Sequence, residues 1–148
     1  MVFSILFRLL FFFPGFSIPA ESNSTIPLPE SIQVTRTFQR VPDKNDYTVT
    51  VSIQSSGITG FARYTDFLPP DAQVTILQSA GSEARTIDGK VKFVWTSMPT
   101  DPEIKVIYTI AFADSKLIMH YRGEFRYLSD NVVRNYDLTP SDLKLIGE

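Results

Sequence analysis

Apolar and polar side chains alternate without a break over residues 47–54 (YTVTVSIQ), and this alternation constrains the fold more than any other sequence feature. Successive side chains of a β-strand point to opposite faces, so such a segment has one face for a core and one for water. Similar short runs recur across residues 31–138, separated by turn residues such as Pro, Gly, Asp and Asn. The sequence predicts an all-β domain, with one short helical turn at 139–143.

We predict an immunoglobulin-like sandwich of seven or eight strands. Each sheet would have one apolar face, and because no helix is available to cover it, two antiparallel sheets are expected to pack face to face. A closed barrel is the alternative. The Asp88-Gly89 pair predicts a tight hairpin, and Gly123 predicts a bend or bulge in its strand. The expected strands cover residues 32–41, 47–54, 58–67, 73–80, 91–95, 105–112, 117–127 and 132–138.

The amino-terminal segment has the parts of a secretory signal peptide. Residues 1–20 contain one cation at Arg8, an apolar run, the helix-breaking pair Pro14-Gly15 and a terminal Ala20. This pattern predicts export to the periplasm, the cell surface or the medium. The alternative is an uninterrupted span from Val2 that anchors the chain, and contact with a membrane is expected only through this segment if it is not cleaved.

The remaining chain divides into three parts by composition. Residues 21–30 are polar and rich in proline, and we predict an extended spacer there. Residues 31–138 form the predicted sandwich, and residues 139–148 form a predicted C-terminal tail.

Composition excludes several classes of chemistry. The chain has no cysteine, so thiolate metal sites, iron-sulfur clusters and cysteine nucleophiles are absent. Its 14 basic and 16 acidic residues are spread evenly along the sequence, for a net charge of -2, so nucleic acid is not an expected partner. No glycine-rich loop links a strand to a helix for phosphate binding. We expect no cofactor and no metal.

Three sequence features resemble the immunoglobulin-like modules of unknown function found on exported bacterial proteins. They are Tyr47-Thr48-Val49-Thr50-Val51, then Thr65-Asp66-Phe67-Leu68-Pro69, and then Val94-Trp95 followed by Ile107-Tyr108-Thr109-Ile110. The resemblance implies a β-sandwich with a surface or periplasmic location and no transferable catalytic residues. This chain holds one copy rather than a repeat array, which argues against a stalk role.

The sequence offers little for catalysis. His120 is the only histidine, and no nucleophile elbow accompanies it, so we expect no catalytic residues. Four acidic residues are expected at strand ends or in loops, where they would cap turns rather than act as acid and base. These residues are Asp66, Asp71, Asp101 and Glu103.

One polar row is a candidate partner face. His120, Arg122, Glu124 and Arg126 share one side of a predicted strand. The row could dock a partner, or it could protect a sheet edge from aggregation. We predict an exported, non-enzymatic domain that acts through contact with a protein of the cell envelope.

The alternative function is a carbohydrate-binding module or a small adhesin that binds a glycan through an aromatic surface. Four aromatic residues could form that surface, although they could equally pack in the core. They are Tyr64, Trp95, Tyr121 and Tyr127.

Overall fold

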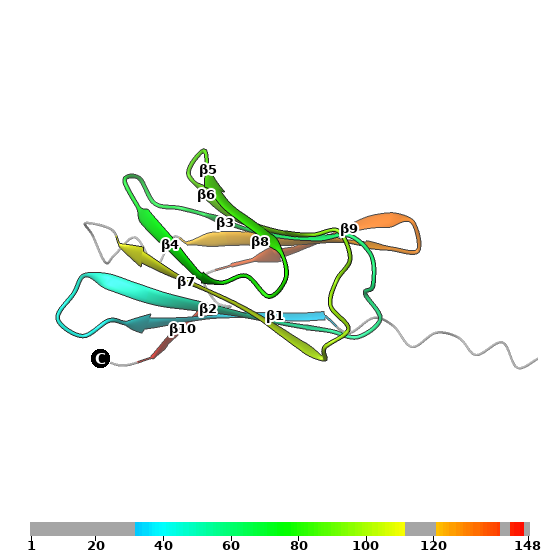
Figure 1. The fold of residues 1–148 in the computed structure, drawn as a ribbon, viewed down its shortest axis with the longest axis horizontal. Helices are drawn as coiled ribbons and strands as arrows, with labels where there is room; N and C mark the ends of the chain where they lie inside the picture. The colour runs from blue at the N-terminus through cyan, green and yellow to red at the C-terminus, as the bar shows by residue number, and fades with distance from the viewer. Residues whose placement is uncertain (1–31, 112–120, 140–142, 147–148) are drawn as a thin grey trace, which may run out of the picture.

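The chain forms two β-sheets packed face to face in the computed structural model, which describes residues 32–111, 121–139 and 143–146 (Figure 1). This arrangement confirms the predicted all-β sandwich. The first sheet has the order β10 (Leu143–Ile146), β1 (Ile32–Arg40), β2 (Asp46–Ser55), β7 (Glu103–Ala111), β4 (Gln73–Gln78). The second has the order β5 (Glu83–Ile87), β6 (Lys90–Trp95), β3 (Ala62–Phe67), β8 (Arg122–Ser129), β9 (Val132–Leu138).

The described residues form ten strands, two more than the upper expected number. β5 lies at an edge of its sheet, where most of its side chains are exposed, so the apolar alternation is weak. β10 lies in the segment predicted as a tail and pairs in parallel with β1, whereas every other pairing is antiparallel. The predicted signal peptide, the spacer and residues 140–142 of the predicted helical turn lie outside the described residues.

The core lies between the two sheets and is built from the alternating residues. Val49, Val51 and Ile53 of β2 are fully buried, as the alternation predicted. The rings of Phe93 and Phe125, which belong to the second sheet, are buried in the same core cluster. Burying a large apolar side chain contributes about 1.5–3 kcal/mol, so this shared core is the main stabilising feature of the domain.

Two tight hairpins set the strand register of the second sheet. Asp88 and Gly89 have φ angles of 50° and 65°, which places both in the left-handed region and confirms the predicted turn between β5 and β6. Asp130 and Asn131, at 49° and 61°, form the equivalent turn between β8 and β9. Since each turn has two residues, the strands pair directly from the turn onward.

The bulge predicted at Gly123 is wrong. β8 pairs with β3 in unbroken register, and Gly123 lies directly opposite Asp66. The irregularity lies instead in β4, between Ile76 and Gln78. Gly123 instead leaves room for the side chain of Asp66, which lies beside it.

Candidate functional site

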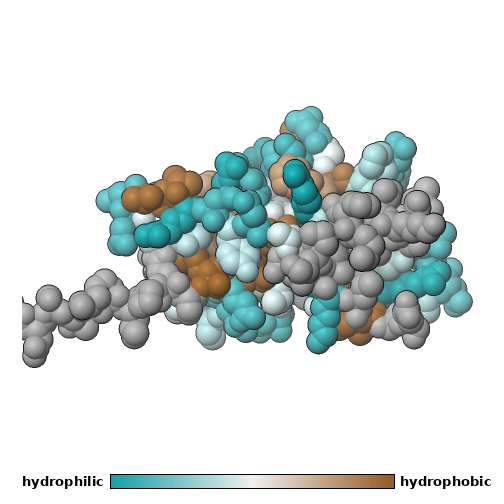
Figure 2. All heavy atoms as spheres, turned by 180° about the vertical axis from the view of Figure 1, so that it is seen from behind, coloured by the Kyte–Doolittle hydropathy of each residue, from teal (hydrophilic) through white to brown (hydrophobic). Residues whose placement is uncertain are grey.

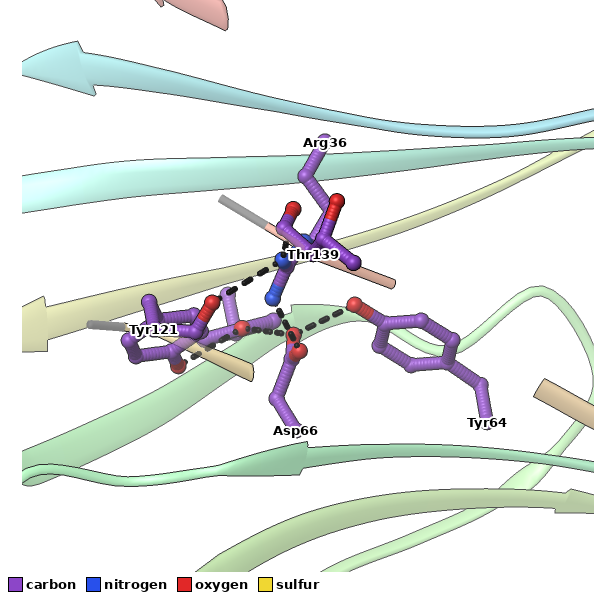
Figure 3. A network of polar contacts seen from close by, with 6 residues as sticks. Arg36, Tyr64, Asp66, Tyr121 and Thr139 are labelled. Atoms are coloured by element: carbon purple, nitrogen blue, oxygen red, sulfur yellow. Dashed lines mark hydrogen bonds and ion pairs between the residues drawn. The ribbon is translucent and has the colours of Figure 1, made fainter. Parts of the chain in front are cut away.

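A buried ion pair crosses the core between the two sheets. Arg36 extends from β1 of the first sheet and donates from Nη1 to Oδ1 of Asp66 on β3 of the second, at 2.8 Å (Figure 3). Both side chains are completely buried. Nη2 of Arg36 donates to the carbonyl oxygens of Tyr121 and Thr139, at 3.1 and 3.2 Å. This pair therefore ties β1 to both ends of the β8–β9 hairpin.

Three tyrosines extend the hydrogen bonding of this group, while Nε of Arg36 has no hydrogen-bond partner among the described residues. The hydroxyls of Tyr64 and Tyr108 each donate to Oδ2 of Asp66 at 2.5 Å. The hydroxyl of Tyr121 lies 3.0 Å from that of Tyr108. Because Tyr108 gives its only proton to Asp66, Tyr121 must be the donor in this contact. We call Arg36, Tyr64, Asp66, Tyr108 and Tyr121 the buried network.

Burial and charge shift the pKa values within the network. Burial raises the pKa of Asp66, and the Arg36 guanidinium and the two phenols oppose that rise. Burial is the largest influence on Arg36 and lowers its pKa, but Asp66, Tyr64 and Tyr108 together outweigh burial, so the Arg36 pKa is raised. Because arginine stays protonated in proteins, Asp66 supplies the counter-charge that this buried cation requires.

Gly123 leaves the space that Asp66 occupies. A Cβ atom at this position would overlap Oδ1 of Asp66 and would lie 3.2 Å from Nη1 of Arg36. No residue larger than glycine fits beside the ion pair without moving it. The glycine is therefore explained by the close approach of the network, which no local sequence pattern indicated.

The buried network corrects the interpretation of Asp66. We predicted a turn-capping acid, but Asp66 lies within β3 and is buried, because its counter-charge comes from a strand 30 residues away in sequence. The other three acids are exposed at the surface, and Asp71 has a φ angle of 60° in a turn. Glu103 pairs with Lys105 at 3.0 Å, and that hydrogen bond lowers the Glu103 pKa.

The aromatic surface predicted for glycan binding does not form from the proposed residues. Trp95, Tyr64, Tyr121 and Tyr127 are all buried. Nε1 of Trp95 donates to the carbonyl oxygen of Ala80 at 2.9 Å, and Tyr64 and Tyr121 belong to the buried network. These rings pack in the core. Three of them are on the inward side of their strands, and Tyr121 lies directly before β8.

The charged row lies on the outer face of the second sheet. Glu124 accepts from Arg63 of β3 at 3.2 Å and from Arg126 at 2.9 Å. Arg126 also donates to Asn135 of β9 at 3.3 Å. β8 is paired on both sides, so the alternative that this row protects a sheet edge is wrong. His120 lies outside the described residues, so its place in the row stays a prediction.

Strand pairing gathers cations on this outer face. The register places six of them on it against three acids, an excess of three positive charges on a chain whose net charge is -2. The opposite outer face, on the first sheet, has no such excess, because its two acids and two lysines balance and uncharged residues such as Thr37, Thr50 and Ser52 lie at its centre. The cations are Arg63, Arg85, Lys90, Lys92, Arg122 and Arg126, and the acids are Glu83, Glu124 and Asp137.

A pocket and an apolar tip border the charged face. The pocket, of about 350 Å³, lies between β3, β8 and β9 and is lined in part by Phe67, Arg122 and Asp137. At the tip of the β8–β9 hairpin, Val132 and Val133 are 56% and 71% exposed. Figure 2 shows an apolar patch at this end of the molecule. Among the described residues, β9 pairs only with β8 and is an edge strand.

The described residues hold no group of three or more metal-ligating side chains of the His, Cys, Asp and Glu types. No helix within them is long and apolar enough to cross a membrane.

The buried tyrosines predict a cooperative alkaline transition. Burial, followed by the charge of Asp66, raises the pKa values of Tyr64 and Tyr108 well above the usual value near 10, and burial does the same for Tyr121. Their contribution to stability is therefore complete below about pH 10 and is lost as the pH rises further, because only the unfolded chain can release these protons.

We expect three of the six tyrosines to ionise only as the protein unfolds. Absorbance near 295 nm and far-ultraviolet circular dichroism, followed together during an alkaline titration, check this. The same chain in concentrated guanidinium chloride, where all tyrosines are exposed, is the control. Full ionisation of every tyrosine with an intact dichroism spectrum would contradict the structure.

Comparison with known proteins shows the fold but no family. The sequence matches no protein family and no curated protein. Among solved structures, the chain is similar to ACE19, the collagen-binding subdomain of the Enterococcus faecalis surface protein ACE, with a TM-score of 0.50 and 8% identity over 77% of this chain and 96% of that one. This likeness is to a β-sandwich domain of a bacterial surface protein.

Two further solved structures are similar at lower TM-scores. A non-cellulosomal cohesin from Archaeoglobus fulgidus has a TM-score of 0.37 and 12% identity over 76% of this chain and 86% of that one. A GH20 exo-β-N-acetylglucosaminidase from Vibrio harveyi has a TM-score of 0.47 and 7% identity over 78% of this chain. The chain spans only 18% of that enzyme's length.

Proposed function

We propose that this protein is an exported, non-enzymatic domain that binds a partner protein in the periplasm or at the cell surface. The docking surface consists of the charged row at Arg122, Glu124 and Arg126 together with the adjoining edge strand β9. His120 extends the row in this proposal. Export follows from the signal-peptide pattern of residues 1–20.

The main observation in support of this proposal is the exposed edge of β9. An edge strand presents unpaired backbone N–H and C=O groups, and a partner's extended segment can pair with them. Native edges are commonly protected by charge or proline, and β9 carries charges only in its later part, at Arg134 and Asp137. Its first two residues, Val132 and Val133, are both more than half exposed. An exposed valine pair on an open edge favours a protein partner over solvent or a glycan.

The comparisons support this proposal at the level of the fold. ACE19 is, by its description, a collagen-binding subdomain of a surface protein. A sandwich of this kind can therefore serve as a binding domain. The buried network is sealed from water, so it supports the fold beneath the docking surface rather than a reaction.

Blocking the edge is expected to abolish partner capture. In Val133→Lys, a charge replaces the apolar side chain at the edge, and Arg126→Glu reverses a charge in the row. Because both positions are exposed, we expect either variant to unfold within about 1 kcal/mol of the wild type. A pull-down from an envelope fraction, with protein identification by mass spectrometry, measures capture.

Leu77→Lys is the matched control for this experiment. Leu77 is 58% exposed on β4, an edge strand of the other sheet. We expect this variant to retain the partner that Val133→Lys loses. Equal capture by Val133→Lys, Arg126→Glu and the wild type would exclude this docking surface.

A further inference from the structure

Three cations on the outer face have no acidic partner among the described residues. Lys90 and Lys92 lie on β6 and Arg122 lies on β8, whereas Arg63, Arg85 and Arg126 each pair with a glutamate. The register places Lys90 and Arg122 on either side of Phe67, in one row across β6, β3 and β8. We call Lys90, Lys92, Phe67 and Arg122 the basic cluster.

The aromatic ring holds two of these cations in place. The Nζ atom of Lys90 lies 5.3 Å from the centroid of Phe67, and the Cζ atom of Arg122 lies 5.2 Å from it. Both distances are within the range of cation–π attraction. The ring therefore brings two like charges into one row while leaving their hydrogen-bond donors available to an anion.

A buried hydroxyl beside the cluster also has no partner. Thr65 pairs with Lys92 on one side and with Glu124 on the other, and its side chain is on the outer face. The residue is only 2% exposed, and its Oγ1 atom forms no hydrogen bond with any described residue. A buried hydroxyl costs free energy unless it is paired, so a bound group that reaches this atom when the side chains covering it move would gain a hydrogen bond.

Acidic residues lie on both sides of the cluster, but on the β5 side Glu83 is paired with Arg85 at 3.4 Å. Glu124 and Asp137 lie opposite each other on β8 and β9, and with Arg122 they line the pocket between β3, β8 and β9. Glu124 is paired with Arg63 and Arg126, whereas Asp137 has no cationic partner among the described residues and repels an anion from the β9 side of the pocket. An anionic ligand is therefore directed to the β6 and β3 side, where Lys90 and Lys92 lie.

We propose that the basic cluster binds an acidic, extended segment of the partner protein. Alternate side chains of a strand are about 6.6–6.8 Å apart, so Lys90 and Lys92 match two carboxylates at alternate positions of such a segment. Arg122, two strands from β6, lies about 9.5 Å further across the face and adds positive charge beside the segment. This inference rests on the protein-binding function proposed above and specifies the chemistry of the partner.

Direct binding of a defined peptide tests the inference. The full chain is titrated by calorimetry with a synthetic peptide of alternating glutamate and serine, and with one of alternating glutamine and serine. We expect only the acidic peptide to bind, with an affinity that falls as the salt concentration rises. The double variant Lys90→Glu with Lys92→Glu is expected to weaken binding at least about tenfold, which corresponds to about 1.4 kcal/mol.

Lys144→Glu is the matched control, because Lys144 is exposed on β10 of the other sheet. We expect it to bind the acidic peptide as the wild type does. No binding by the wild type, or equal binding by the double variant, would overturn the inference. Inorganic polyphosphate that binds as tightly as the peptide and depends on the same lysines would also overturn it, in favour of a general polyanion site.

The same variants separate this inference from the proposed function. In one outcome, Val133→Lys loses an envelope protein that the Lys90→Glu with Lys92→Glu variant captures as well as the wild type does. The docking surface is then supported, and the inference of an acidic partner segment is wrong. If Val133→Lys and Arg126→Glu capture the protein equally well, while the Lys90→Glu with Lys92→Glu variant loses both this capture and the acidic peptide, the basic cluster stands and the docking surface at β9 is wrong.

Discussion

Replacing Asp66 with alanine is expected to lower the free energy of unfolding by about 3–5 kcal/mol. The change leaves the guanidinium of Arg36 buried without its counter-charge, and the hydroxyls of Tyr64 and Tyr108 lose the acceptor that they share. Removing one member of a buried ion pair costs far more than the pair contributes, because the remaining charge cannot reach water. Chemical denaturation followed by fluorescence of the single tryptophan, Trp95, measures the loss.

A double variant separates the unpaired charge from the loss of packing. Asp66→Leu combined with Arg36→Met replaces both charges with apolar groups of similar length. We expect it to be more stable than Asp66→Ala, although the tyrosine hydroxyls remain without an acceptor. If Asp66→Ala unfolds within about 1 kcal/mol of the wild type, the ion pair described here does not support the fold.

Replacing Gly123 with alanine is expected to have a comparable effect, about 3 kcal/mol, for a steric reason. The added Cβ atom overlaps Oδ1 of Asp66, and the carboxylate can move only by leaving Arg36 or the tyrosines. The backbone of β8 is paired on both sides and cannot move away easily. The same denaturation experiment measures this variant.

Gly60→Ala is the control for the glycine substitution. A Cβ atom at Gly60 would lie 3.7 Å from the carbonyl oxygen of Leu128, an ordinary van der Waals distance. We expect this variant to unfold within about 1 kcal/mol of the wild type. A tolerated Gly123→Ala would show that β8 and β3 are further apart than the structure describes.

The two predictions bear on function because the buried network lies directly beneath the docking surface. Gly123 and Asp66 are opposite each other, and their neighbours along the strands, Arg122 and Phe67, belong to the basic cluster. A rigid support fixes the positions of the surface charges, which a binding surface requires. Loss of the network is therefore expected to disturb docking even in variants that remain folded.

Several features of the fold could be predicted from the sequence. The alternation over residues 47–54 indicated a half-buried strand, and the Asp88-Gly89 pair indicated a hairpin, because both are local consequences of backbone geometry. Part of the candidate site could be predicted for the same reason. Arg122, Glu124 and Arg126 share a face because they alternate along one strand.

The remaining features depended on pairings between distant strands. Asp66 was assigned to a turn because its partner, Arg36, lies on another sheet and leaves no local signal. The predicted aromatic surface was wrong because alternation along a strand does not show which of its two faces is buried. β10 was missed because its parallel pairing with β1 depends on where the chain returns after β9.

By itself, the sequence determined the layered β architecture and the pattern of its strands, because side-chain alternation and turn chemistry act over a few neighbouring residues. Only the tertiary structure decided which charges meet. Cations spread evenly along the chain come together on one face because strand pairing places β6, β3 and β8 side by side. The same pairing buries Asp66 against Arg36, since a buried charge is tolerated only where the fold supplies its counter-charge.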